Sequence, residues 1–103
     1  MAPDAICFEE RACPNDPVIY HAYQLHTRLL RGQTLLAKVL FDTSFGIDLL
    51  ESLPEVDNTR IGFIGYSYGG RTALFAPAFD KRIKVSVSNC GSTTFKQMLA
   101  QNI

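Results

Sequence analysis

The sequence has no tryptophan, no run of like charge, no long apolar stretch and no cysteines in a CxxC spacing. Ten Lys and Arg residues balance ten Asp and Glu residues, so we expect neither nucleic acid nor an anionic membrane as a partner. The longest apolar stretch, 73–79, is far shorter than the roughly 20 residues that span a bilayer. The first dozen residues lack the apolar core of a signal peptide, and the three cysteines cannot all pair. These absences predict a cytoplasmic protein with reduced thiols.

The composition is that of an ordinary globular protein. Apolar residues make up 47% of the 103 residues and charged residues 19%. These values exclude disordered, collagen-like and disulfide-dense classes. The length leaves room for one domain or part of one.

The first half of the chain predicts two helices. Asp16 is a typical N-cap, and Pro17 suits the first position of a helix over 18–30. Gly32 ends this helix, and apolar residues at spacings of three and four predict a second helix over 36–50. Before them, 1–6 resembles the end of a strand, and 9–16 is predicted to be a loop.

The second half alternates strands and helices. We predict a strand over 60–65 that is buried on both faces, a sharp turn over 66–70 and a helix over 70–79, followed by a strand over 83–88 and a helix over 94–101. Strands that alternate with helices indicate an α/β fold with a parallel sheet and flanking helices.

A GxSxG motif lies between the predicted strand and helix. It runs from Gly65 through Tyr66, Ser67 and Tyr68 to Gly69, which is the setting of a nucleophile elbow. The turn would expose the Ser67 hydroxyl, and the Tyr68 N–H would face a developing oxyanion.

The other residues of the motif are expected to shape the turn. Gly65 and Gly69 would avoid collisions with the neighbouring strand and helix, and Gly70 would extend the close approach. The rings of Tyr66 and Tyr68 would shape an acyl pocket. The alternative is a structural turn in which Ser67 is an ordinary helix cap.

The segments 57–70 and 79–84 resemble the α/β-hydrolase superfamily, and specifically its dienelactone-hydrolase and acetyl-xylan-esterase-like group. The stretch 2–11 resembles the strand end and loop that precede the elbow in that group. The resemblance implies a three-layer α/β/α fold of which residues 1–103 are the central part, without the N-terminal strands and the C-terminal acid and histidine segments. Because Ser67 replaces the cysteine of dienelactone hydrolases proper, it favours the esterase and peptidase relatives, including peptidase S9-like ones.

The residues that would activate Ser67 are missing from the sequence. In this superfamily the acid and the histidine follow the serine, but no histidine follows His26, and Asp80 is the only acidic residue after Ser67. Asp80 is expected at the wrong end of the sheet to be the triad acid. His21 and His26 are five residues apart on one predicted helix, so we expect packing or surface roles rather than a metal pair.

Other candidates are weaker. Glu9, Glu10 and Arg11 are expected either at the lip of the site or in a solvated loop. Cys90 is expected to be a buried, unactivated thiol at the end of a strand.

The sequence therefore predicts a serine hydrolase that acts on a small ester or a peptide, with no metal and no organic cofactor. We expect the 103-residue chain alone to lack activity, because the base and the acid are absent. The alternatives are a non-catalytic hydrolase-like binding module and a site completed by another chain. Unpaired sheet edges are expected to favour self-association.

Overall fold

The computed structural model describes residues 1–13 and 16–101, which form two compact units: a helical unit, Met1–Asp57, and a strand–helix–strand unit, Asn58–Ile103. The helical unit contains the 3-10 helix η1 (Glu9–Arg11) and the helices α1 (Pro17–Leu30) and α2 (Leu35–Glu51). The second unit contains β1 (Ile61–Tyr66), α3 (Tyr68–Phe79), β2 (Ile83–Asn89) and α4 (Phe95–Ala100).

Helix α1 begins and ends as its sequence predicts. The Asp16 carboxylate accepts hydrogen bonds from the N–H groups of Val18 and Ile19 at 2.9 and 3.1 Å, and proline stands at the first helical position. After the helix, Gly32 adopts a φ of 69°, a left-handed conformation that glycine adopts without strain.

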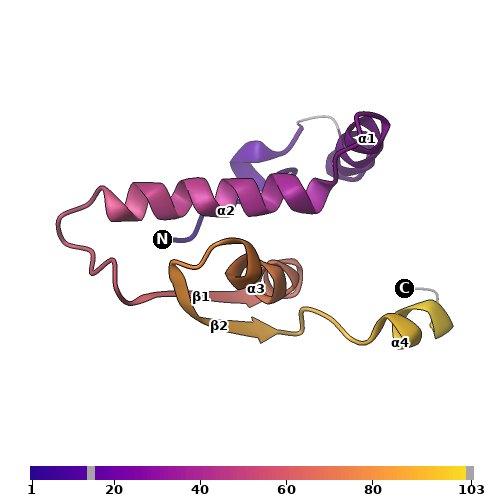
Figure 1. Ribbon diagram of the computed structural model, residues 1–103. Helices are drawn as coiled ribbons and strands as arrows, with labels where there is room; N and C mark the ends of the chain where they lie inside the picture. The colour runs from indigo at the N-terminus through magenta and orange to yellow at the C-terminus, as the bar shows by residue number, and fades with distance from the viewer. Residues whose placement is uncertain (14–15, 102–103) are drawn as a thin grey trace. The chain divides into compact units, whose positions relative to one another are not determined.

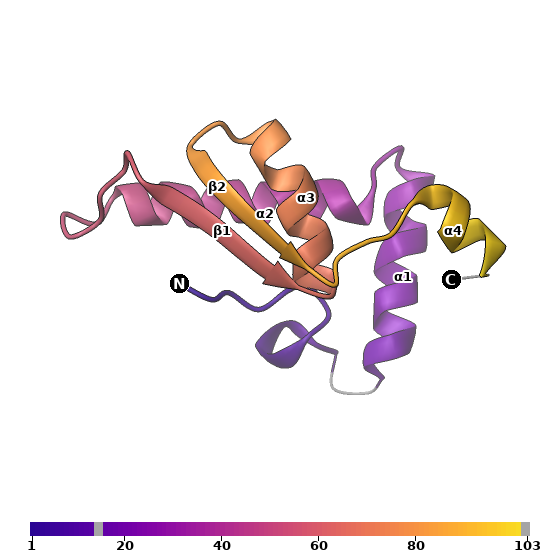
Figure 2. The same ribbon diagram turned by 90° about the horizontal axis from the view of Figure 1, so that it is seen from below.

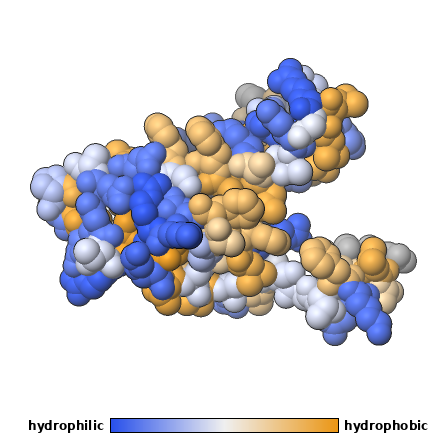
Figure 3. Space-filling model, in the orientation of Figure 1, coloured by the Kyte–Doolittle hydropathy of each residue, from blue (hydrophilic) through white to orange (hydrophobic). Residues whose placement is uncertain are grey.

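Helix α2 begins at a second cap, where Thr34 Oγ1 accepts the Ala37 N–H at 3.0 Å. It crosses α1 steeply, as both views show (Figures 1 and 2). Its buried residues are Leu35, Val39, Leu40 and Ile47. Other apolar residues of α2 remain exposed, Phe41 and Phe45 among them, and Figure 3 shows orange patches interrupted by blue ones in the region of this helix.

The second unit is a parallel βαβ arrangement. β1 and β2 pair in parallel, with Gly62 opposite Val85 and Tyr66 opposite Asn89. Helix α3 packs against both strands, and Figure 2 shows it alongside the sheet. The predicted α/β class with a parallel sheet is confirmed, whereas the complete three-layer hydrolase fold stays a prediction.

Three sequence predictions need correction. Residues 1–6 form no strand among the described residues, and the predicted loop contains η1. The strand predicted to be buried on both faces has one open face, because Ile64 is 77% exposed and lies opposite Val87, which is 50% exposed. Only the face toward α3 is covered within this unit.

The described helices give no sign of a bilayer-spanning element. Over residues 1–13 and 16–101, none is both long and apolar enough to cross a membrane.

Candidate active site

Ser67 occupies the turn between the end of β1 and the start of α3. Its backbone has φ 51° and ψ −111°, a strained conformation that costs a non-glycine residue about 1–3 kcal/mol. Its side chain is exposed and makes no capping hydrogen bond to α3. An ordinary N-cap is extended and accepts a hydrogen bond from the first turn, so the alternative in which Ser67 is such a cap is wrong.

The strained turn is held by the end of β2. The Ser67 N–H donates to the Asn89 carbonyl at 2.9 Å, and the Ser67 carbonyl accepts the Arg71 N–H at 3.0 Å. The backbone of Ser67 is therefore bonded both to its own helix and to the neighbouring strand.

Two glycines of the motif permit close backbone approaches. A Cβ on Gly65 would lie 2.0 Å from the Gly69 carbonyl oxygen, and a Cβ on Gly70 would lie 2.6 Å from the Asn89 carbonyl oxygen. Gly69 differs, because a Cβ there would meet no heavy atom within 4 Å. The expectation that Gly69 avoids a collision is therefore wrong.

Gly91 was not predicted to take part in the elbow. A Cβ on Gly91 would lie 2.2 Å from the carbonyl carbon of Gly70 and 2.4 Å from Ser88 Oγ. A single glycine after a strand does not by itself predict a close contact in the sequence. The contact of Gly91 with Gly70 becomes evident only when β2 is placed beside α3.

Two serine side chains of β2 also form hydrogen bonds to helix α3. Ser88 Oγ donates to the Gly70 carbonyl at 2.7 Å, and Ser86 Oγ donates to the Ala73 carbonyl at 2.6 Å. In an α-helix the Ala73 carbonyl would accept the N–H of residue 77, but Pro77 has no N–H. The Ser86 hydroxyl therefore supplies the donor that Pro77 removes.

The side chains around Ser67 are mostly open to solvent. Tyr66 is 70% exposed, and Tyr68 is half-buried as the first residue of α3. N–H groups of a first helical turn point toward the N-terminus of the helix, which is the side on which Ser67 lies. Cys90 follows β2 with φ 52° and is exposed, so the prediction of a buried thiol is wrong.

Asp80 has a structural role at the far end of α3. It is 8% exposed, and its two carboxylate oxygens accept hydrogen bonds from Arg82 Nε at 2.9 Å and Arg82 Nη2 at 2.6 Å. This arrangement agrees with its exclusion as the triad acid. His21 is half-buried and His26 exposed, both on α1 of the helical unit.

The three residues proposed for the lip of the site lie in η1 of the helical unit. Arg11 donates to the Asp4 carbonyl at 3.2 Å and pairs with Asp42 of α2 at 2.8 Å, so it joins η1 to that helix. Glu9 and Glu10 are exposed. Their assignment to the lip stays a prediction.

Asp42 accepts from two cations. Burial raises the pKa of its carboxyl, but hydrogen bonds and charges from Lys38 and Arg11 outweigh burial and hold the pKa below its usual value. Asp42 is therefore ionised and neutralises part of the positive charge around it.

No metal centre emerges from the described parts of the chain. They contain no cluster of three or more His, Cys, Asp or Glu side chains that could hold an ion.

The chain is similar in sequence to known esterases and hydrolases. A family model described as glucuronyl esterase of fungi matches residues 22–98, about three quarters of the chain. The protein named "Putative hydrolase YtaP" from Bacillus subtilis (strain 168) is 39% identical over 62 residues, which are 60% of this chain and 21% of the relative. Carbohydrate esterase MZ0003, from an unknown prokaryotic organism, is 33% identical over 55 residues, 53% of this chain and 13% of the relative.

The chain thus spans about a fifth or less of the length of these relatives. No solved structure matches it at a significant level. The matches confirm the predicted resemblance to esterase-type hydrolases and name neither the dienelactone hydrolase nor the acetyl-xylan esterase group.

Proposed function

Because the chain belongs to the fungal glucuronyl esterase family, we propose that it carries the nucleophile of a serine esterase whose substrate is an ester of a sugar acid. Ser67 is the proposed nucleophile. The carbohydrate esterase among its relatives supports a carbohydrate ester over a peptide as the substrate class.

The backbone of Ser67 is the observation that carries this proposal. A positive φ at a residue that is neither glycine nor asparagine is uncommon, and strained residues of this kind cluster at active sites. The strain holds the exposed hydroxyl away from the capping position that a serine before a helix ordinarily takes.

The proposed chemistry is acyl transfer to water. Ser67 Oγ bonds to the ester carbonyl carbon while its proton passes to a base, and the alcohol leaves with a proton as its C–O bond breaks. Water then cleaves the acyl-serine and releases the sugar acid. The backbone N–H of Tyr68, at the start of α3, is the proposed donor to the oxyanion that forms at each step.

We propose that the base and the acid come from outside these 103 residues. A triad base follows the serine in α/β hydrolases, and this sequence has no histidine after His26. The chain alone is then inactive toward esters, while an added base would restore reaction at Ser67.

Chemical rescue tests this function. The chain is incubated with a fluorophosphonate probe, with and without imidazole, and the modified residue is identified by peptide mass spectrometry. We expect labelling of Ser67 that increases with imidazole and disappears in Ser67→Ala. Ser92→Ala is the matched control, because Ser92 is an exposed serine outside the elbow. In this variant Ser67 should be labelled to the same extent as in the unaltered chain.

The benzyl ester of glucuronic acid tests the substrate class. With imidazole present, we expect the mass of one glucuronoyl group on Ser67. Equal labelling of Ser67 and Ser92 would contradict the proposed nucleophile, and no labelling under any condition would favour a non-catalytic binding module.

A further inference from the structure

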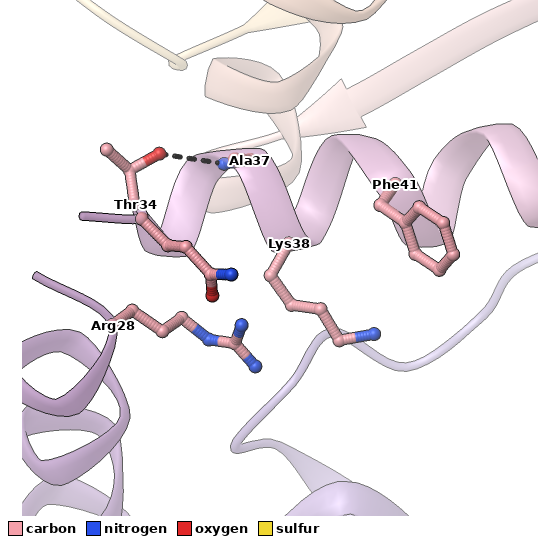
Figure 4. Close-up of a pocket in the computed structure, with 6 residues that line it drawn as sticks. Arg28, Thr34, Ala37, Lys38 and Phe41 are labelled. Atoms are coloured by element: carbon pink, nitrogen blue, oxygen red, sulfur yellow. Dashed lines mark hydrogen bonds between the residues drawn. The ribbon is translucent and has the colours of Figure 1, made fainter. Parts of the chain in front are cut away.

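The helical unit contains a surface cavity of about 250 Å³, open to solvent on one side, that the esterase chemistry does not use. Arg28, near the end of α1, lines it together with Gln33 and Thr34 from the link between the helices. The remaining lining residues are Ala37, Lys38 and Phe41 of α2. Figure 4 shows the guanidinium of Arg28 facing the Lys38 side chain across the opening.

Arg28, which lines this cavity, also has an unsatisfied donor. Its Nε is buried and has no hydrogen-bond partner among residues 1–13 and 16–101. A guanidinium cannot lose its charge in a protein, and a buried donor without an acceptor is costly, more so when it is charged. The group therefore favours an acceptor that the described residues do not provide.

The surrounding charges favour an anion. Lys38 pairs with Asp42 across one helical turn, and Asp42 also pairs with Arg11. Arg11 and Arg28 both lower the pKa of Cys7, against the burial that raises it, so both cations lie near that thiol. One carboxylate is thus shared by two cations, and Arg28 forms no ion pair with the residues that the structure describes, 1–13 and 16–101.

The N-terminus of α2 adds to the positive charge around the cavity. Thr34 caps the helix at the wall of the cavity, and Ala37 belongs to its first turn. The N-terminus of a 17-residue helix carries partial positive charge. Phe41 gives the cavity an apolar side, and the centroid of its ring lies 5.4 Å from Lys38 Nζ.

We propose that this cavity binds a small oxyanion, the carboxylate or phosphate group of a small molecule, through the guanidinium of Arg28. Arginine offers paired N–H donors that match such groups. The volume is below the roughly 300–1,000 Å³ typical of drug-sized ligands, so the ligand is the size of phosphate or a sugar acid. The site lies within the helical unit and does not rest on the proposed role of Ser67.

The Nε–H resonance of Arg28 reports binding directly. The ¹⁵N-labelled chain is titrated separately with inorganic phosphate and with glucuronate, and the Arg28 signal is assigned from its loss in Arg28→Gln. We expect a saturable shift with at least one probe. A shift with phosphate alone identifies a phosphate site, and a shift with glucuronate alone identifies a carboxylate site.

Arg28→Gln should weaken binding by about 10- to 100-fold, as expected for loss of a charged hydrogen bond. The backbone amide signal of Ala37, which lines the cavity, measures binding in this variant. Arg31→Gln is the matched control, since Arg31 is exposed and does not line the cavity. Absence of a saturable shift with either probe, or equal weakening by Arg31→Gln, overturns the proposal. If Arg28→Gln fails to fold, the titration of the unaltered chain still decides.

Discussion

Replacement of Ser86 by alanine should loosen helix α3, because Pro77 makes the helix depend on the Ser86 hydroxyl. The Ala73 carbonyl belongs to a residue that is 2% exposed, and it accepts from Ser86 Oγ at 2.6 Å. Pro77 stands where the helix would otherwise supply a donor to this carbonyl. In Ser86→Ala the carbonyl loses that donor.

The magnitude follows from the burial of this carbonyl. An unsatisfied buried polar group costs about 1–3 kcal/mol, which corresponds to a roughly 5- to 150-fold larger equilibrium constant for opening of the helix at 25 °C. Native-state hydrogen exchange of the α3 amides measures this opening for α3 alone, even if the two units unfold separately.

Two further variants isolate the cause. In a Pro77→Ala background residue 77 has an N–H that can donate to Ala73, so Ser86→Ala should cost much less there. Ser88→Ala is the matched control, because the Gly70 carbonyl that Ser88 bonds can also accept the N–H of Leu74 within α3. If Ser86→Ala costs the same with and without Pro77, the reasoning is wrong.

Three other measurements test the site and its surroundings. Gly91→Ala should destabilise the turn around Ser67 by about 1–3 kcal/mol through overpacking, as measured by amide exchange in α3. Gly69→Ala should cost less, because a Cβ at Gly69 would meet open space. A larger cost for Gly69→Ala than for Gly91→Ala would contradict the structure. The pKa of Asp42 is lowered, so its contribution to stability is complete above the unfolded value of about 3.9 and is lost as pH falls through the lower folded value. Asp42→Asn should therefore reduce the loss of stability at acid pH, measured by circular dichroism as a function of pH. If the variant and the unaltered chain lose stability over the same pH range, this role of Asp42 is refuted. Iodoacetamide should modify exposed Cys90 before buried Cys7, whose thiol pKa burial raises; mass spectrometry that finds Cys7 modified first would contradict the assigned burial.

Much of the local structure could be predicted because it depends on neighbouring residues. Asp16 and Pro17 define the start of α1, because the Asp16 side chain accepts hydrogen bonds from the N–H groups two and three residues further along the chain. Gly32 follows the helix and turns the chain through its own positive φ. The position of Ser67 between a strand and a helix follows from the GxSxG motif in the same way. Such features require no knowledge of what packs against them.

The features that escaped prediction depend on distant residues. Gly91 matters only because Gly70 lies against it, and a side chain at Gly69 would meet open space although Gly69 belongs to the motif. Cys90 is exposed because the chain turns away after β2 with a positive φ. The η1 turn is joined to α2 through Arg11 and Asp42, which are 31 residues apart. Sequence spacing alone does not reveal such pairs.

The hydrogen bond from Ser67 to Asn89 has a consequence for the order in which the chain folds. The strained turn obtains this bond from a strand that is synthesised 22 residues later. Until β2 pairs with β1, the chain around Ser67 is free to relax into an ordinary extended cap. The strained conformation of Ser67 is therefore acquired late, together with the sheet, and a nascent chain that ends before β2 should carry the motif without this conformation.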